Sequence, residues 1–166
     1  SRVRHHPPKK GVRAIFLKHL RVQPWVLREN CSDPISWPST PMRIFRIYTK
    51  SSGESAVELR EVPMSGARPM SETFRGGAVF FRETPEGHVQ DFHNAPRRQL
   101  IFLTSGILEL ETSEGARFVL RPGDLIFAED MTGKGHITRS LRDTRGFVHV
   151  AMPDDFDISA WPLADK

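Results

Sequence analysis

The sequence predicts an all-β domain over residues 42–166. From residue 42 the chain consists of short runs rich in β-branched and aromatic residues, and the turns between these runs contain Gly, Pro, Asn or Asp. Such side chains suit strands, and such turn residues supply a positive φ or fix the direction of the chain. Many short strands with regular turns are typical of a β-sandwich or a closed barrel.

The first two strands are predicted before residue 63. MRIFRIYTK, residues 42–50, is rich in β-branched and aromatic residues and is followed by the turn SSGE. AVELREV, residues 56–62, predicts a weaker strand. Both are expected to extend a sheet, and because exposed sheet edges invite pairing with a second subunit, a homodimer is the expected assembly.

Further short strands are predicted in close succession after a loop that contains several Gly and Pro residues. In order, they are AVFFRE, HVQDFH, QLIFLT, ILELET, ARFVL, LIFAE, GHITRSL and GFVHVAM. The dipeptide Ser105-Gly106 between QLIFLT and ILELET predicts a tight hairpin. No run of about 18 apolar residues occurs, so no membrane-spanning helix is expected.

Residues 1–41 are predicted to form a basic, Pro-containing arm and lead-in. Residues 1–50 hold 11 Lys and Arg against 2 acidic residues, a net charge of +9, whereas the remainder has a net charge of −5. The arm is either a solvated tail, a nucleic-acid arm or a targeting peptide, the last because VRAIFLKHLRV has amphipathic helical spacing. Nucleic acid is not expected, because no aromatic residue interleaves with SRVRHHPPKK to stack on bases.

The single cysteine, Cys31, excludes an intrachain disulfide and suits a reducing compartment. A cytoplasmic location is therefore predicted. The basic N-terminal sequence leaves organelle targeting open as an alternative.

Residues 76–152 resemble the conserved barrel of the cupin superfamily. The first cupin motif is Gly, five residues, His, one residue, His, three or four residues, Glu, six residues, Gly. Here Gly87, His93 and Gly106 keep the spacing, and the turn RPGD that usually precedes the second motif follows at residues 121–124.

Two positions of the first motif depart from the metal-binding pattern. Ala95 stands where the second His is expected, and Gln99 stands in place of Glu. In the second motif we take His136 as the histidine, which requires a longer loop, EDMTGKG, in front of it. The resemblance is thus to a cupin with a degenerate metal motif.

The resemblance implies a single-domain, cupin-type double-stranded β-helix (jelly-roll) barrel, with its site inside the barrel near one mouth. It also implies frequent dimers. The family includes dioxygenases, isomerases, decarboxylases, sugar epimerases and non-enzymatic binders, so the fold alone does not choose among these functions.

Metal binding is one possible use of the site. Strand alternation places Asp91 and His93 on one face. Two histidines and one carboxylate form the open iron site of many oxygenases, so Asp91, His93 and His136, with Gln99 as a weak neutral ligand, are candidate metal ligands. Because Ala95 has no donor atom and Gln99 is uncharged, we predict no cofactor or a weakly held divalent metal.

Binding of an organic acid is the other use. His93 and His136 are candidate catalytic residues, because imidazole titrates near neutral pH and can act as a general base. Arg97, Gln99 and Lys134 are candidate substrate-binding residues. An inward Arg grips a carboxylate through two parallel hydrogen bonds, and a Lys binds an anion.

The roles of several other residues stay open at this point. Glu129 and Asp130 precede His136 and either orient it or cap a turn. His149 alternates with valines on the last strand and faces either the cavity or water. Phe156, Ile158 and Trp161 are expected to pin the C-terminal tail to the barrel.

Three functions are therefore carried forward. The first is a cupin-domain protein that binds a small polar or aromatic acid in the barrel cavity and, as an enzyme, converts it by isomerase, lyase or cyclase chemistry. The second is a non-enzymatic module that binds a small ligand. The third is a metal-dependent dioxygenase. A small molecule is the expected partner in each case.

Overall fold

A computed structural model of the chain describes residues 41–164, which form eight strands and contain no helix. The all-β fold class predicted from the sequence is confirmed. The basic arm, with Cys31 and the helical periodicity near residues 12–22, lies outside the described residues. Between residues 41 and 164 no helix is long and apolar enough to cross a membrane.

The eight strands lie close to the predicted runs. Their bounds are β1 (Arg43–Thr49), β2 (Ser55–Glu61), β3 (Val79–Thr84), β4 (Val89–His93), β5 (Gln99–Thr112), β6 (Arg117–Leu120), β7 (Leu125–Ala128) and β8 (His136–Ala151).

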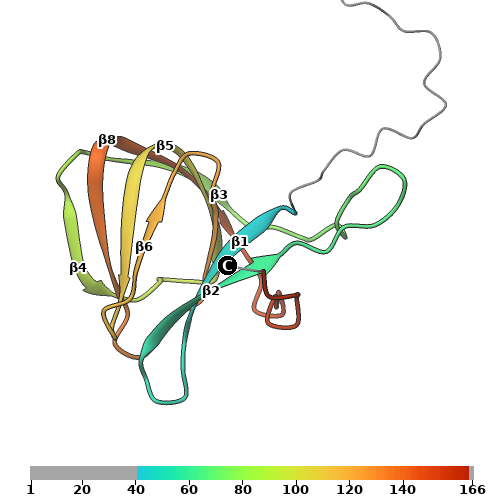
Figure 1. Ribbon diagram of the computed structural model, residues 1–166, viewed down its shortest axis with the longest axis horizontal. Coiled ribbons are helices and arrows are strands. Elements are labelled where there is room, and N and C mark those ends of the chain that lie inside the picture. The colour runs from blue at the N-terminus through green and yellow to red at the C-terminus, as the bar shows by residue number, and fades with distance from the viewer. Residues whose placement is uncertain (1–40, 165–166) are drawn as a thin grey trace, which may run out of the picture. The chain divides into compact units, whose positions relative to one another are not determined.

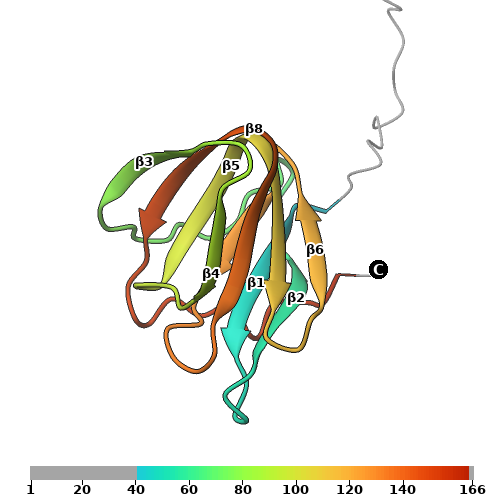
Figure 2. The ribbon, with the colours of Figure 1, turned by 90° about the vertical axis from the view of Figure 1, so that its left-hand side faces the viewer.

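The strands form one continuous sheet that is folded into two layers. The order along the main path is β2-β1-β7-β5-β8-β3, while β4 pairs with β8 and β6 pairs with β5. Only β1 and β7 run parallel among these pairs. The two longest strands, β5 and β8, pair with each other in both layers, so β4, β8, β5 and β6 lie side by side in Figures 1 and 2.

The predicted hairpin at Ser105-Gly106 is wrong. Gly106 has a φ of 73°, but the chain continues through it in a single strand, and the β5–β8 register shifts on both sides of Ser105. A glycine with positive φ can serve a turn or a bulge, and here it serves a bulge that bends the strand from one layer to the other. The two last predicted runs likewise form one strand, which bends near Asp143 (φ 57°).

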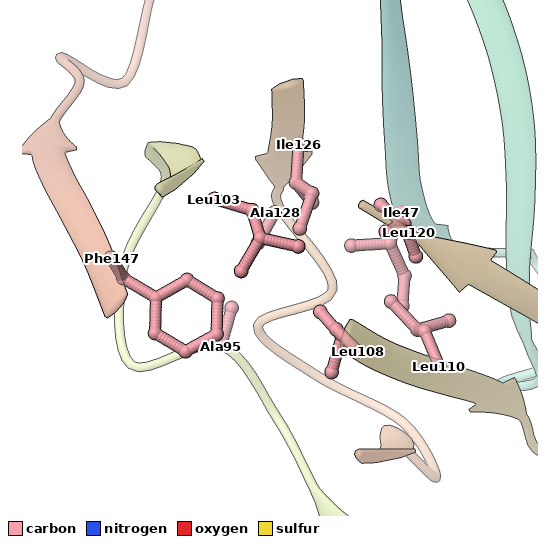
Figure 3. Packing of buried hydrophobic residues seen from close by; sticks show 9 residues of the cluster. All are labelled: Ile47, Ala95, Leu103, Leu108, Leu110, Leu120, Ile126, Ala128 and Phe147. Atoms are coloured by element: carbon pink, nitrogen blue, oxygen red, sulfur yellow. The ribbon is translucent and has the colours of Figure 1, made fainter. Parts of the chain in front are cut away.

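One hydrophobic core lies inside the barrel. Its buried residues come from β1, β5, β6, β7 and β8 and from the loop after β4, and Figure 3 shows how their side chains cluster. They are Ile47, Ala95, Leu103, Leu108, Leu110, Leu120, Ile126, Ala128 and Phe147.

A second apolar cluster lies where β1 and β7 meet the C-terminal tail. Phe127 on β7 is fully buried and contacts Phe156 edge-on at 5.1 Å between ring centroids. Ile158 is also fully buried, and Trp161 packs against the same cluster. The tail is therefore pinned to the barrel as expected.

The tail also covers part of the edge of β2. The Glu61 amide donates to the Pro162 carbonyl at 2.8 Å, and the Ala164 amide donates to the Leu59 carbonyl at 2.9 Å. The opposite edge strand of the main path, β3, pairs only with β8 among the strands between residues 41 and 164.

Candidate functional site

A cavity of about 350 Å³ lies within the barrel. Much of its wall is apolar, with Ile47, Ile101, Leu108, Leu110 and Ile126 among the lining residues. The polar lining comes mainly from β3, β4, β5 and β8 and comprises Arg82, Thr84, Gln90, His93, Asn94, Gln99, His136, Thr138, Arg145 and His149. An apolar cavity with a few convergent polar groups is the usual form of a small-molecule site.

The two predicted catalytic histidines lie against each other in this cavity. His93 and His136 are directly opposite in the β4–β8 register, with ring centroids 4.3 Å apart. His93 Nδ1 lies 2.8 Å from the Asp91 carbonyl oxygen, and His136 Nδ1 lies 2.6 Å from Asp130 Oδ2. Since both Nδ1 atoms have partners, Nε2 is the ring nitrogen through which each histidine can contact a ligand.

Asp130 orients His136, which is one of the two roles left open by the sequence. The Asp130 side chain is fully buried, and its Oδ1 has no hydrogen-bond partner in the described chain. Asn94 holds the loop in front of His136, because its Nδ2 donates to the carbonyls of Asp130 (3.0 Å) and Thr132 (2.7 Å). A buried carboxylate on Nδ1 fixes the tautomer of an imidazole and stabilises its protonated form.

The surroundings of His93 favour its neutral form. Burial lowers the pKa of His93, and proximity to His136 lowers it further. Two adjacent imidazoles, one of them hydrogen-bonded to a buried carboxylate, place a possible proton acceptor and a hydrogen-bonding neighbour in the same wall.

Asp91 lies outside the lining of the cavity. The β4–β8 register shifts between Gln90 and His93, so these two residues line the cavity although they are three positions apart. The Asp91 side chain is exposed, and its Oδ1 accepts a hydrogen bond from the Phe92 amide at 2.8 Å. The alternation that grouped Asp91 with His93 does not hold, because a bulge breaks it.

Arg97 and Lys134 also lie outside the cavity lining. Arg97 sits in a bend after β4, exposed, with its guanidinium 5.7 Å from the centroid of the Phe80 ring. Lys134 is exposed and forms an ion pair with Glu54 at 2.5 Å. The loop around Lys134 has glycines with positive φ on both sides of it, so the strand alternation assumed from the sequence does not apply there.

Gln99 and Ala95 lie in the cavity wall, as their motif positions suggested. Gln99 is buried, and its Oε1 lies 3.3 Å from His149 Nδ1. Ala95 is buried in the core cluster, and its amide donates to the Asp130 carbonyl at 3.3 Å. The position of the second motif histidine therefore contributes packing and no donor atom to the cavity.

Arg145 and Arg82 are cavity residues that the sequence did not suggest. Arg145 is only 2% exposed, and no acidic group lies within ion-pair distance of it between residues 41 and 164. Burial, followed by the charge of Arg82, lowers the pKa of Arg145 to about 10, so this guanidinium still carries its charge at neutral pH. Arg82 is exposed and lines the same cavity.

His149 lies in the cavity wall as well, which is one of the two orientations left open by the sequence. Its ring stacks on Phe80 with centroids 4.5 Å apart and planes 7° apart. Burial, with smaller effects of the Arg82 and Arg97 charges, lowers the pKa of His149 to about 4. The ring is therefore neutral at physiological pH.

Cross-strand register explains why these residues share one wall. On β3 and β8 the directly opposite pairs are Phe80 with His149, Arg82 with Phe147, and Thr84 with Arg145. Directly opposite residues of an antiparallel pair project to the same face, and every second residue does so along each strand. His149 in the cavity therefore places Arg82 and Arg145 there too, a signal that becomes usable only when the pairing is known.

The donor set of the cavity does not fit a divalent metal ion. Of the three histidines in its wall, only His93 and His136 lie against each other, and two imidazoles fall short of the three or four protein ligands usual for such sites. Asp130 contacts Nδ1 of His136, and Gln99 Oε1 contacts Nδ1 of His149. In the part of the chain that the structure describes, no three His, Cys, Asp or Glu side chains are grouped to hold a metal. The prediction of weak or absent metal binding stays a prediction.

Comparisons with known proteins give similarities of fold. No family model matches the sequence, and no curated protein sequence matches it. Similar structures include a cupin 2 conserved barrel domain protein from Rhodopseudomonas palustris, with 17% identity, 72% of this chain and 76% of that chain covered, and a TM-score of 0.37. A cupin-2 domain from Rhodospirillum rubrum has 15% identity, coverage of 75% and 77%, and a TM-score of 0.37.

The DMSP lyase DddQ from Ruegeria pomeroyi DSS-3 is also similar, with 22% identity and a TM-score of 0.39. The match covers 48% of this chain and spans only 39% of the lyase.

The glycines of the first motif and the RPGD sequence lie at turns and at a bulge of the barrel. Gly87 has a φ of 75° in the turn before β4, and Gly106 forms the bulge of β5. The turn at residues 121–124 joins β6 to β7, where the Arg121 amide donates to Asp124 Oδ2 at 2.6 Å. With two layers of strands around a cavity that holds both motif histidines, the chain has the all-β barrel that its resemblance to the cupins implied.

Proposed function

We propose that the chain binds a compact polar or aromatic acid inside the barrel and converts it by proton transfer. The observation that carries this proposal is Arg145, a buried guanidinium without an acidic partner in the described chain, in the wall of a cavity that also contains His93 and His136. The proposal includes a homodimer and a cytoplasmic place of action.

The charge of Arg145 supports an anionic ligand. A buried charge is costly unless a counter-ion pairs with it and its hydrogen bonds are satisfied. A carboxylate meets both needs, because it can accept two parallel hydrogen bonds from one guanidinium. Arg82, which is exposed where it lines the cavity, adds positive potential that attracts an acid from solution.

His136 is the proposed general base. It would take a proton from the carbon next to the carboxylate, so that the C–H bond breaks and an N–H bond forms at Nε2. The electron pair left on carbon either expels a leaving group from the neighbouring carbon, as in a lyase, or is protonated at another carbon, as in an isomerase. Asp130 stabilises the imidazolium formed in this step, and its 2.6 Å contact with Nδ1 supports that role.

The test begins with a panel of small carboxylic acids, scored by thermal shift and by calorimetry on the purified protein. We expect at least one acid to bind, and we expect Arg145→Met to weaken that binding by about tenfold or more. Arg142→Met is the matched control, because Arg142 is an exposed residue on the same strand. Binding unaffected by Arg145→Met would refute the proposal.

The non-enzymatic module is the main competing function. Mass spectrometry of the mixture after long incubation with each bound acid would reveal a converted product. An acid that binds through Arg145 but is recovered unchanged would favour a binding module over an enzyme.

A further inference from the structure

We propose that the acid carries a hydroxyl group close to its carboxylate, and that Nε2 of His149 accepts the hydrogen bond from this hydroxyl. The inference names the substrate class of the cavity, and it rests on the proposed function.

Three buried polar atoms on one wall of the cavity lack hydrogen-bond partners within the described chain. They are Thr84 Oγ1, Arg145 Nε and His149 Nε2. Their side chains are 3%, 2% and 6% exposed, and all three residues line the cavity. Buried polar atoms normally have partners, so a cluster of three without them is typical of a site whose partner is a ligand.

We assign His149 Nε2 as the acceptor of the neutral ring. Its Nδ1 lies 3.3 Å from Gln99 Oε1, and a carbonyl oxygen can only accept. Nδ1 therefore carries the proton of the neutral ring, and burial keeps the ring neutral by lowering the pKa of His149 to about 4. Nε2 is left with a lone pair that requires a donor.

The side chains around His149 do not satisfy this lone pair. The ring stacks on Phe80 and lies 5.7 Å from the Phe147 ring, centroid to centroid. Nε2 has no partner in the described chain although Arg82 and Arg97 are near enough to influence the ring electrostatically. A donor must therefore come from the contents of the cavity.

A hydroxy acid matches the combined pattern. Its carboxylate accepts from the guanidinium of Arg145, while its hydroxyl donates to His149 Nε2 on the same wall. The Thr84 hydroxyl can donate or accept and so complements either group. A simple acid would bury Nε2 without a donor, at a cost of about 1–3 kcal/mol, which corresponds to about fivefold to 150-fold weaker binding.

The apolar remainder of the cavity favours a hydrophobic substituent on the acid. Ile101, Leu108 and Ile126 are part of the lining. Mandelate is a suitable probe, because it combines a carboxylate, an adjacent hydroxyl and a phenyl ring. Phenylacetate lacks the hydroxyl, and 2-methoxy-2-phenylacetate, the methyl ether of mandelate, keeps the oxygen but has no proton to donate.

The experiment is calorimetry of the full chain with these three acids. We expect mandelate to bind about tenfold or more tightly than either of the other two. Equal binding of phenylacetate or of the methyl ether would overturn the inference while leaving an acid-binding cavity intact. No binding of any of the three would count against the proposed function, and the inference would be lost with it.

A variant then assigns the preference to His149. His149→Phe keeps an aromatic ring against Phe80 but removes the Nε2 acceptor. This variant should therefore bind mandelate and phenylacetate with about equal affinity. Arg145→Met should instead weaken the binding of both acids by similar factors, so that the ratio of the two affinities stays nearly unchanged. A preference that survives in folded His149→Phe would overturn the assignment, and the ligand series on the parent protein tests the hydroxyl requirement without any variant.

Discussion

Arg145 keeps a positive charge in the barrel without an acidic partner in the described chain, so it is expected to reduce the stability of the ligand-free fold. Replacing a buried ion pair by apolar side chains of similar volume is often neutral or stabilising, by about 1–4 kcal/mol, and replacing Arg145 leaves no acidic partner behind. We therefore expect Arg145→Met to keep or raise the midpoint of urea unfolding while it weakens acid binding by about tenfold or more. A midpoint well below that of the parent would show that Arg145 serves the fold.

His149 makes the stability of the barrel depend on pH. Its pKa is about 4 in the folded chain and 6.5 in the unfolded chain, so between these values the unfolded chain binds more protons. Stability from this residue is fully present above about pH 6.5 and is lost as the pH falls toward 4, with a slope of at most about 1.4 kcal/mol per pH unit. Urea unfolding at several pH values should show this decline, and His149→Phe should flatten it. An unchanged slope in that variant would contradict the assignment.

Asp130 should matter for turnover more than for binding. Asp130→Asn keeps the size of the side chain but removes the charge that stabilises a protonated His136, so kcat is expected to fall by about a hundredfold or more while KM changes little. Asp154→Asn, at an exposed position of the C-terminal segment, is the control. The measurement is steady-state kinetics on whichever acid the carboxylate panel identifies, and a change confined to KM would contradict the proposed role.

The sequence identified part of this site because motif spacing fixes position independently of residue type. His93, Gln99 and His136 were placed in the cavity correctly on that basis. Asp91 and Lys134 were assigned by strand alternation, which fails at a bulge and at glycines with positive φ. Such breaks depend on how the partner strand pairs, so they are not visible in the local sequence.

Gly135, in the loop that positions His136, has no room for a side chain. Gly135 has a φ of 70°, and a Cβ there would lie 2.3 Å from the His93 carbonyl oxygen. Gly115 has a similar φ of 84° but nothing within 4 Å of the added Cβ. Both substitutions by Ala carry the backbone cost of about 1–2 kcal/mol, but only Gly135→Ala also forces β4 away from β8.

Chemical denaturation of the two variants separates these costs. We expect Gly135→Ala to lose clearly more unfolding free energy than Gly115→Ala, and to lose acid binding because His93 and His136 no longer face each other. Equal losses in the two variants would mean that the close approach at Gly135 is relieved without disturbing the strands.

At the scale of elements the sequence predicted the strands better than their connections. β-branched and aromatic runs marked every strand, because side-chain shape and alternation are local properties. The error at Gly106 arose because a glycine with positive φ is compatible with both a hairpin and a bulge. Only the pairing of Ile107–Thr112 with β8, far away in the chain, decides between them.

The edge strand β3 is the surface on which the predicted homodimer is best tested. Phe81 is 78% exposed and Val79 is 56% exposed, and both lie on the outward face of β3. Exposed apolar residues on an edge strand favour pairing with another chain. We expect a dimer by light scattering at micromolar concentration and a monomer for Phe81→Lys. A monomeric parent would contradict the prediction, and Arg142→Met again serves as the exposed control.

The bend of β8 fixes the separation between His136 and Arg145 within the barrel. One continuous strand carries His136 before the bend and Arg145 and His149 after it, so the span from the proposed base to the proposed carboxylate-binding residue is set by the backbone and by the bend near Asp143. Strands rise by about 3.3 Å per residue and are hard to stretch. Acids of different length could thus occupy the cavity equally well, yet only those whose reactive carbon reaches His136 would be converted. The length of the acid would then change kcat and leave its binding affinity nearly unchanged.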